Sequence, residues 1–378
     1  MSPRRRTEEA ATRAAFFVAG FGTAAWAPLV PFAKHRLGVD DGTLGLLLLC
    51  LGAGSIAAMP VAGALAARFG CRRVIGAASL AVCVALPLLA TNGDILSLGV
   101  ALLLFGAGVG TVDVVVNLQA ILVERGSGRS RMSEFHGWYS IGGIGGAAGV
   151  SFVLALGGAP VAATLAAGAV ILTTLALFGR GLLRHGGDRA GPGFVWPGGV
   201  VLGIGALCFV SFLAEGAMLD WGALILTTLH QTDPARSGLG YAVFSAAMMA
   251  GRLSGDRVVR ILGGRAVLLG GALCAAFGVV LMVSVPSWAG ALAGFGLVGL
   301  GASNIVPVLY SALGRQHAMP ANLAVSAVTA IGYAGILAGP AGIGLVAHFA
   351  GLAFAFLVVA ALLLAVAAGS GRVMRASG

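Results

Sequence analysis

An aspartate stands in the middle of a long apolar segment of this chain, where a charged side chain is costly. Asp113 lies in the stretch FGAGVGTVDVVVNLQA, residues 105–120. An ionisable group inside a bilayer costs roughly 2.5 to 3.5 kcal/mol on insertion scales, so it indicates a functional site by default. A carboxyl group in such surroundings can take up and release a proton. We therefore predict that Asp113 couples proton movement to function, with simple packing between helices as the alternative.

Polar and small residues accompany Asp113 at helical spacing. Asn117 follows four residues later and Gly110 precedes by three, which places all three on one face of a helix. A second carboxyl group inside an apolar segment is Glu215, in the stretch EGAMLDW that ends at Trp221. We predict that Glu215 is a further proton-coupling residue.

Residues that would support other chemistry do not form a recognisable pattern. The five cysteines contain no CxxC pair, and the six histidines form no HExxH motif or ligand-spaced cluster. His136 and Ser140 are four residues apart, but a third member of a catalytic triad is missing. We therefore expect no enzyme activity, no metal site and no cofactor.

The elements that hold these residues are expected to be helices that cross a membrane. Hydrophobic residues make up 58% of the 378 residues, charged residues only 10%, and the mean hydropathy is +0.99. Apolar runs of about 18 to 28 residues are long enough to cross a hydrocarbon core of about 30 Å as helices. We predict an all-α membrane protein in a lipid bilayer, with twelve transmembrane spans at residues 14–33, 43–67, 74–91, 95–122, 135–156, 159–178, 198–226, 237–256, 265–285, 288–313, 321–348 and 351–370.

The net charge of +10 is distributed unevenly between the loops. With both termini cytoplasmic, 20 of the 23 Lys and Arg residues, Arg252 among them, are counted on the cytoplasmic side, and only Lys34, Arg36 and Arg236 lie outside. Such a bias in short loops sets the orientation of a membrane protein. The charge therefore predicts a multi-pass protein of a bacterial inner membrane with cytoplasmic termini, and it does not indicate a nucleic-acid partner.

The second half of the chain repeats the first at a shift of about 190 residues. The segment GTVD, which ends at Asp113, matches GASN, which ends at Asn304. Trp26 matches Trp221 near the outer ends of the first and seventh spans. We predict two pseudo-symmetric six-helix bundles, residues 1–178 and 198–378, joined by a cytoplasmic linker at residues 179–197.

Arginine-rich turns after the second and eighth spans complete this pattern. With six plus six helices, these turns resemble the major facilitator superfamily of secondary transporters, whose loop motif G-x-x-x-D-R-x-G-R-R corresponds to GALAARFGCRR at residues 63–73. The aspartate of the motif is Ala67 here, whereas the repeat keeps it as Asp256. The resemblance implies the fold of that superfamily and transport by alternating access.

In this superfamily the loop aspartate caps the amino end of a helix of the opposite half and thereby closes the cytoplasmic side. The resemblance implies that Asp256 binds the start of the fifth span near residues 133–136, and that Ala67 cannot do so for the eleventh. The alternative is that the loop charges only anchor the loops at lipid headgroups. The expected cytoplasmic gate comprises Arg68, Arg72, Asp256, Arg257 and Glu124.

Two stretches resemble a narrower group. GVGTVDVVVNLQA, followed by FHGWYSIGGIGG, is similar to the fucose permease branch of proton-coupled sugar symporters. With EGAMLDW, the pattern also resembles a bacterial group related to the rhizopine-associated membrane protein family. The resemblance implies that Asp113 carries the proton, and that Asn117 and Tyr139 contact a small, sugar-like solute. We expect a monomer whose partners are this solute and a proton.

Further candidates for the solute site carry alternatives of their own. Trp26 and Trp221 could stack on a sugar ring or belong to an interfacial aromatic belt. Asn304 and Tyr310 share a face of the tenth span and could line the cavity or simply pack between helices. The segment GILAGPAGIG, residues 335–344, resembles the GPxxG motif of drug–proton antiporters, so a multidrug exporter is the alternative function.

Overall fold

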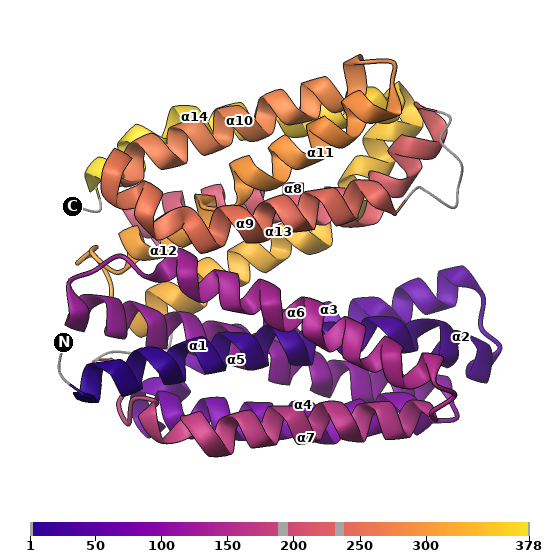
Figure 1. The fold of residues 1–378 in the computed structure, drawn as a ribbon, viewed down its shortest axis with the longest axis vertical. Coiled ribbons are helices and arrows are strands. Elements are labelled where there is room, and N and C mark those ends of the chain that lie inside the picture. The colour runs from indigo at the N-terminus through magenta and orange to yellow at the C-terminus, as the bar shows by residue number, and fades with distance from the viewer. Residues whose placement is uncertain (1–2, 188–195, 231–237, 377–378) are drawn as a thin grey trace. The chain divides into compact units, whose positions relative to one another are not determined.

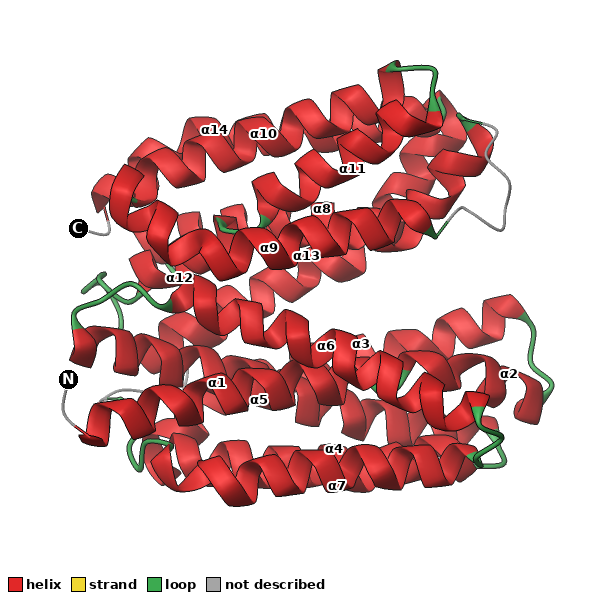
Figure 2. Ribbon diagram, in the orientation of Figure 1, coloured by secondary structure: helices red, strands yellow, loops and turns green. Residues whose placement is uncertain are grey.

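The computed structural model describes residues 3–187, 196–230 and 238–376. All regular elements in these ranges are helical, as Figures 1 and 2 show. The α-helices are α1 Pro3–Ala24, α2 Val30–Leu37, α3 Asp41–Phe69, α4 Cys71–Thr91, α5 Ile95–Ser127, α6 Met132–Ala155, α7 Pro160–Phe178, α8 Gly199–Thr228, α9 Leu239–Leu262, α10 Gly264–Ser284, α11 Trp288–Ala302, α12 Ile305–Leu313, α13 Ala321–Ala350 and α14 Leu352–Ala376. Two short 3-10 helices are η1 Ala27–Leu29 and η2 Gly179–Gly181.

The predicted spans coincide with these helices. Within the described ranges, eleven helical segments are long and apolar enough to cross a membrane, and three of them are composite. Arg4–Leu37 joins α1, η1 and α2, Pro160–Gly181 joins α7 and η2, and Trp288–Leu313 joins α11 and α12. The remaining predicted span, the eighth, is α9, whose 24 residues match the length of α6 but include several charged side chains in the second half. The prediction of an all-α membrane protein is confirmed.

The chain divides into two compact units. Unit 1 comprises Met1–Arg129, Trp138–Trp196 and Pro320–Ala330, and unit 2 comprises Ser130–Gly137, Pro197–Met319 and Ile331–Gly378. The start of α6 therefore belongs to unit 2, and the start of α13 belongs to unit 1. Of the predicted linker, residues 188–195 lie outside the described residues, as does Arg236.

Corresponding turns in the two units have the same backbone conformation. Gly70 joins α3 to α4 with φ +83° and ψ 152°, and Gly263 joins α9 to α10 with φ +80° and ψ 150°. A positive φ favours glycine because a side chain on the residue would be strained. These two glycines occupy equivalent places in the sequence repeat, so the two halves share the backbone conformation of this turn.

In unit 1, α5 packs against α1, α3 and α4. Glycine permits the close approach of α5 to α3, because a side chain on Gly106 would collide with the backbone carbonyl of Leu51. The hydroxyl of Ser55 donates a hydrogen bond of 2.9 Å to the carbonyl of Gly106 and joins the two helices at this point. The face of α5 that contains Gly106 and Gly110 is therefore held against α3.

The first part of the linker is attached to unit 1. The backbone N–H of Arg72, in the first turn of α4, donates to the carbonyl of Leu183 at 2.9 Å. The N–H of Leu183 in turn donates to the side-chain oxygen of Gln119 on α5 at 3.1 Å. Leu183, which follows η2, thus accepts a hydrogen bond from a backbone N–H that the start of α4 would otherwise leave without a partner.

In unit 2, α10 packs against α11 and α14, as Figure 1 shows. The predicted tenth span is not one continuous helix. It is interrupted between α11 and α12 at Ser303 and Asn304, and Asn304 has φ −112° and ψ 2°. Backbone groups freed by such an interruption inside a membrane need partners from the protein. Its equivalent in unit 1, α5, runs without a break for 33 residues.

The close contact of α5 with α3 predicts a specific sensitivity to side-chain size. Gly106→Ala should lower the free energy of unfolding by about 1 to 3 kcal/mol because the added methyl group meets the Leu51 backbone. Thermal unfolding of the detergent-solubilised protein measures this. Gly76→Ala, in α4, is the control, because its methyl group would enter open space. Equal melting temperatures for the two variants would contradict the packing argument.

Candidate transport site

Asp113 lies near the middle of α5, two residues beyond the midpoint of the helix. Its side chain is half-buried, and the side-chain amide of Asn117 is its hydrogen-bond partner. The amide nitrogen of Asn117 is 2.9 Å from the backbone oxygen of Asp113 and 3.5 Å from the carboxylate oxygen Oδ1. No cationic side chain in the described ranges pairs with Asp113. The predicted association of Asp113 with Asn117 is present, and the carboxylate has no counter-ion there.

The helix face on which Asp113 lies follows from its neighbours along α5. Gly110, three residues before, packs against the backbone of Ser55 on α3. Val109, four residues before, lines a small cavity beside α1. Residues three and four apart on a helix are neighbours. Asp113 therefore lies on the face of α5 between α1 and α3. The oxygen Oδ1 of Asn117 has no hydrogen-bond partner among the described residues.

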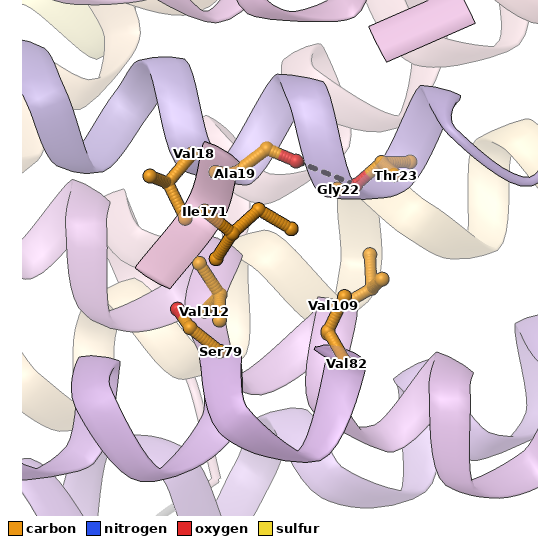
Figure 3. A pocket seen from close by; sticks show the side chains of 9 residues that line it. All are labelled: Val18, Ala19, Gly22, Thr23, Ser79, Val82, Val109, Val112 and Ile171. Atoms are coloured by element: carbon orange, nitrogen blue, oxygen red, sulfur yellow. Dashed lines mark hydrogen bonds between the residues drawn. The ribbon is translucent and has the colours of Figure 1, made fainter. Parts of the chain in front are cut away.

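The cavity beside Val109 is a separate feature of unit 1. It lies among α1, α4, α5 and α7 and has a volume of only about 10 Å³, roughly the room for one water molecule. Figure 3 shows that its lining is mainly aliphatic, with the hydroxyl of Thr23 turned to the carbonyl of Ala19 at 2.8 Å. Pockets that bind organic ligands usually span about 300 to 1,000 Å³ and include several polar groups. Asp113 and Asn117 do not line it, so it is not the predicted solute site.

The remaining candidates of unit 1 are Tyr139 and Trp26. Tyr139 is half-buried near the start of α6, where the absence of a side chain on Gly20 lets α1 approach its backbone carbonyl. Trp26 is only 4% exposed, in the apolar core at the end of α1, and its indole nitrogen has no hydrogen-bond partner in the described part of the chain. Burial in this core differs from the exposure expected of an interfacial anchor.

In unit 2, Glu215 of α8 pairs with Arg252 of α9. The nitrogen Nη2 of Arg252 lies 3.5 Å from Oε1 and 3.4 Å from Oε2 of Glu215. The side chain of Arg252 is 8% exposed, and that of Glu215 is 19% exposed. Arg252, which the charge pattern counts among the cytoplasmic cations, is buried here and paired with a carboxylate. Because α9 continues to Leu262, Arg252 lies well inside the helix, and its place within a predicted span was the signal that could have identified it.

Asn304, the repeat equivalent of Asp113, lies at the interruption between α11 and α12 and joins it to α9. Its amide nitrogen donates to the carbonyl of Gly251 at 3.0 Å and to the hydroxyl of Ser303 at 2.9 Å. The nitrogen Nε of Arg252 lies 3.4 Å from the carbonyl of Ser303. Arg252 therefore touches both Glu215 and the interrupted helix.

Tyr310 and Trp221, the other candidates of unit 2, are enclosed to different degrees. Tyr310 is 1% exposed, and its ring centroid lies 6.0 Å from that of His136. Trp221 is half-buried on α8 beside Gly344 of α13, and among the described residues its indole nitrogen has no hydrogen-bond partner.

The predicted contact of Asp256 with the start of α6 is present. Its two carboxylate oxygens accept hydrogen bonds from the backbone N–H of Ser133 at 3.2 Å and of Glu134 at 2.9 Å. The hydroxyl of Ser130 donates to Asp256 at 3.2 Å. A carboxylate is favoured there because the amino end of a helix has unpaired N–H groups and a positive dipole end.

At the equivalent position in unit 1, neutral groups make the contact between helices. Ala67 has no polar side chain, and Gly63 of α3 instead donates its backbone N–H to the hydroxyl of Ser326 at 3.0 Å. The amide of Asn322 donates to the carbonyl of Gly63 at 3.4 Å. The start of α13 is therefore fixed to α3 without an ion or a carboxylate, as the substitution at Ala67 predicted.

The other residues assigned to the gate have separate surroundings. The guanidinium of Arg68 lies 5.1 Å from the ring centre of Phe69, and Arg72 is bound to the linker through its backbone. Arg257 is exposed on α9, and Glu124 is half-buried in the last turns of α5. These contacts leave the gating role of the four residues a prediction.

Curated relatives extend over nearly the whole chain. The family model of the Major Facilitator Superfamily matches residues 14–192. An uncharacterized MFS-type transporter of Yersinia pestis is 54% identical over 370 residues, which cover 98% of this chain and 96% of the relative. Membrane protein MosC of Rhizobium meliloti is 32% identical over 375 residues, which cover 98% of this chain and 91% of MosC.

Solved structures share the fold at low sequence identity. The Escherichia coli fucose:proton symporter FucP matches with a TM-score of 0.80 at 15% identity, covering 97% of this chain and 98% of FucP. The human organic anion transporter MFSD10 matches with a TM-score of 0.78 at 14% identity, covering 98% and 100%. The helical pattern, the repeat, the loop motif and these relatives lead to one conclusion: the chain is a membrane transporter that belongs to the major facilitator superfamily.

Proposed function

We propose that this protein carries a small polar organic solute, sugar-like or a related metabolite, across the inner membrane of a bacterial cell together with a proton. It would do so as a monomer, by alternating access around a cavity between two bundles of six helices. Family membership supports transport. The structural likeness to a fucose:proton symporter concerns the fold, so the solute class rests on the residues around Asp113.

Proton coupling is proposed because no cationic side chain among the described residues pairs with Asp113. A carboxylate bound to an arginine gives up an ion pair when it takes a proton. Among the described residues, the hydrogen-bond partner of Asp113 is the neutral amide of Asn117, so Asp113 can take up and release a proton without that loss. Protonation removes a charge from the middle of an apolar helix and thereby changes the relative stability of transport states.

The proposed solute site centres on Asn117 and Tyr139 in unit 1. The free oxygen Oδ1 of Asn117 is an acceptor that a solute hydroxyl group can use. Trp26, Trp221, Asn304 and Tyr310 would contribute through transport states that expose them, since Trp26 and Tyr310 are nearly enclosed here. Glu215 is proposed as the second proton-sensitive carboxyl group.

A cytoplasmic gate at Asp256 belongs to the same proposal. The bias of arginine toward one set of loops supports cytoplasmic termini and places the start of α6 on the cytoplasmic side. Asp256 binds that start through two backbone amides, and release of this contact would accompany opening toward the cytoplasm. Arg68, Arg72, Arg257 and Glu124 would assist from the neighbouring loops and helix ends.

Neutralisation of Asp113 should remove proton coupling. In proteoliposomes with an imposed pH gradient, Asp113→Asn should abolish gradient-driven solute uptake but retain solute exchange at equal pH. Asp94→Asn, on the same helix, is the matched control. Hydrogen bonds from Ser97 hold the pKa of Asp94 below its usual range, so this exposed carboxylate stays ionised in the assay. Unchanged gradient-driven uptake by Asp113→Asn would exclude Asp113 from coupling.

The class of solute can be tested by ligand stabilisation of the purified protein. Neutral and acidic sugars and polyols should raise the melting temperature, because a ligand that binds only the folded state stabilises it. Lipophilic cations should have little effect. The reverse result would favour the drug–proton antiporter indicated by the GPxxG-like segment, whose Pro340 lies inside α13.

The contact of Asp256 with α6 predicts a graded effect of substitution. Asp256→Ala should lower the melting temperature because two amides of α6 lose their acceptor, at a cost of about 1 to 2 kcal/mol. Asp256→Asn should retain part of the stability, since asparagine also accepts hydrogen bonds at helix starts. Arg257→Ala, at the exposed neighbour, is the control. Equal loss in Asp256→Ala and Arg257→Ala would indicate a general effect of loop charge.

A further inference from the structure

Three arginines of unit 2 gather where the start of α10 meets the end of α14. Arg265 lies in the first turn of α10, and Arg372 and Arg375 lie in the last two turns of α14. A side chain on Gly371 would place its Cβ atom 3.3 Å from Nη2 of Arg265, so this guanidinium rests against the backbone of α14. The nitrogen Nε of Arg375 donates to the carbonyl of Gly371 at 3.1 Å. We call Arg265, Arg372 and Arg375 the arginine cluster.

The charge of the arginine cluster is not compensated within the described part of the chain. No acidic side chain there pairs with any of the three arginines. The sequences of α10 and α14 contain neither Asp nor Glu, and all three arginine side chains are exposed. Arg372 and Arg375 are three residues apart, so their like charges repel each other on one side of α14. An anion bound at the cluster would offset this repulsion.

The equivalent turn of unit 1 satisfies its backbone differently. Arg72, at the start of α4, corresponds to Arg265 in the sequence repeat, and its N–H donates to the carbonyl of Leu183 in the linker at 2.9 Å. At the start of α10 the N-cap residue is Gly263, which has no side chain, and no backbone carbonyl in the described ranges accepts from the N–H of Arg265. The amino end of a helix carries the positive end of its dipole. The start of α10 therefore adds to the attraction of the arginine cluster for an anion.

Exposed apolar side chains continue from the arginine cluster along both helices. Leu269 and Leu273 follow Arg265 on α10 at intervals of four residues, and they are 38% and 45% exposed. Leu364 precedes Arg372 by eight residues on α14 and is 49% exposed. Residues at four-residue intervals lie on one side of a helix. The cluster thus lies at one end of an exposed apolar surface on α10 and α14, which pack against each other (Figure 1).

An amphiphile with a negative headgroup matches both features of this surface. Guanidinium groups bind phosphate oxygens through paired N–H donors. A soluble phosphate would occupy only the arginine cluster, whereas a phospholipid would also cover the apolar side chains of α10 and α14. A zwitterionic headgroup would bring a cationic group to a place where the described residues offer no carboxylate. The charge of the cluster therefore favours an anionic phospholipid.

We propose that the arginine cluster binds the phosphate group of an anionic phospholipid, and that the acyl chains of this lipid lie along Leu269, Leu273 and Leu364. The bound headgroup offsets the repulsion between Arg372 and Arg375 and holds the start of α10 against the end of α14, so it stabilises unit 2. Such a site needs only helices that lie in a membrane, and it is independent of the solute and of proton coupling.

Lipid titration of the purified protein in detergent tests this site. Phosphatidylglycerol should raise the melting temperature of the wild type by about 3 °C more than phosphatidylcholine does, because a ligand that binds the folded state stabilises it. The triple variant Arg265→Gln/Arg372→Gln/Arg375→Gln should lose this difference. Equal stabilisation of the wild type by the two lipids would overturn the proposal.

The matched control removes three exposed arginines from unit 1. Arg73→Gln/Arg129→Gln/Arg180→Gln lowers the net charge by the same amount and should keep the preference for phosphatidylglycerol. Loss of the preference in both triple variants would indicate general attraction to an anionic surface, and the site would be rejected.

The lipid is distinguished from a soluble phosphate by glycerol 3-phosphate, which has the phosphate without acyl chains. At the same concentration it should not stabilise the wild type, and stabilisation equal to that by phosphatidylglycerol would reject the lipid assignment. If the triple variant of unit 2 does not fold, native mass spectrometry of Arg265→Gln and Arg375→Gln replaces it. Each should retain less phosphatidylglycerol than the wild type, whereas Arg73→Gln should retain as much. Unchanged retention in both unit 2 variants would be decisive against the site.

Discussion

The polar face of α9 is the feature on which the packing of unit 2 depends. Arg252 and Asp256 are four residues apart and share this face, and polar groups inside a membrane must find partners within the protein. Arg252 finds Glu215 of α8, and Asp256 finds the backbone amides at the start of α6. Gly255, between them, has no side chain and admits the amide of Asn304 and the side chain of Ser133. The two charged side chains thus determine which face of α9 packs inward, and the neighbouring helices provide their hydrogen-bond and ion-pair partners.

The sequence allowed prediction of the features that depend on local composition. The length of each apolar run predicted the helices, because a membrane span needs about 20 apolar residues. The contact of Asp256 with α6 followed from a loop motif together with the dipole at a helix start. The place of Asn117 beside Asp113 followed from helical periodicity alone. For the helices and for Asn117 the evidence lies within a few residues of the feature, whereas the Asp256 contact followed from the family resemblance.

Contacts between distant segments that no motif marks were missed. Arg252 was grouped with the cytoplasmic arginines, since periodicity places a residue on a helix face but does not identify the neighbouring helix. The interruption at Ser303 and Asn304 was also missed, because the hydropathy of the span continues across it. The backbone carbonyl of Ser303 accepts from Arg252, and the side-chain amide of Asn304 donates to the carbonyl of Gly251, both about fifty residues away in the chain.

The two carboxyl groups differ in a way that assigns them different tasks. Asp113 has no cation among the described residues, so a proton there changes the net charge of its surroundings by one. Glu215 is paired with Arg252, so a proton there is taken up at the cost of an ion pair. The first arrangement suits a site that takes up and releases protons, and the second stabilises a cation inside the helical bundle. The repeat pairs Asp113 with Asn304 and not with Glu215, so the ion pair is a property of unit 2 that duplication of unit 1 alone does not explain.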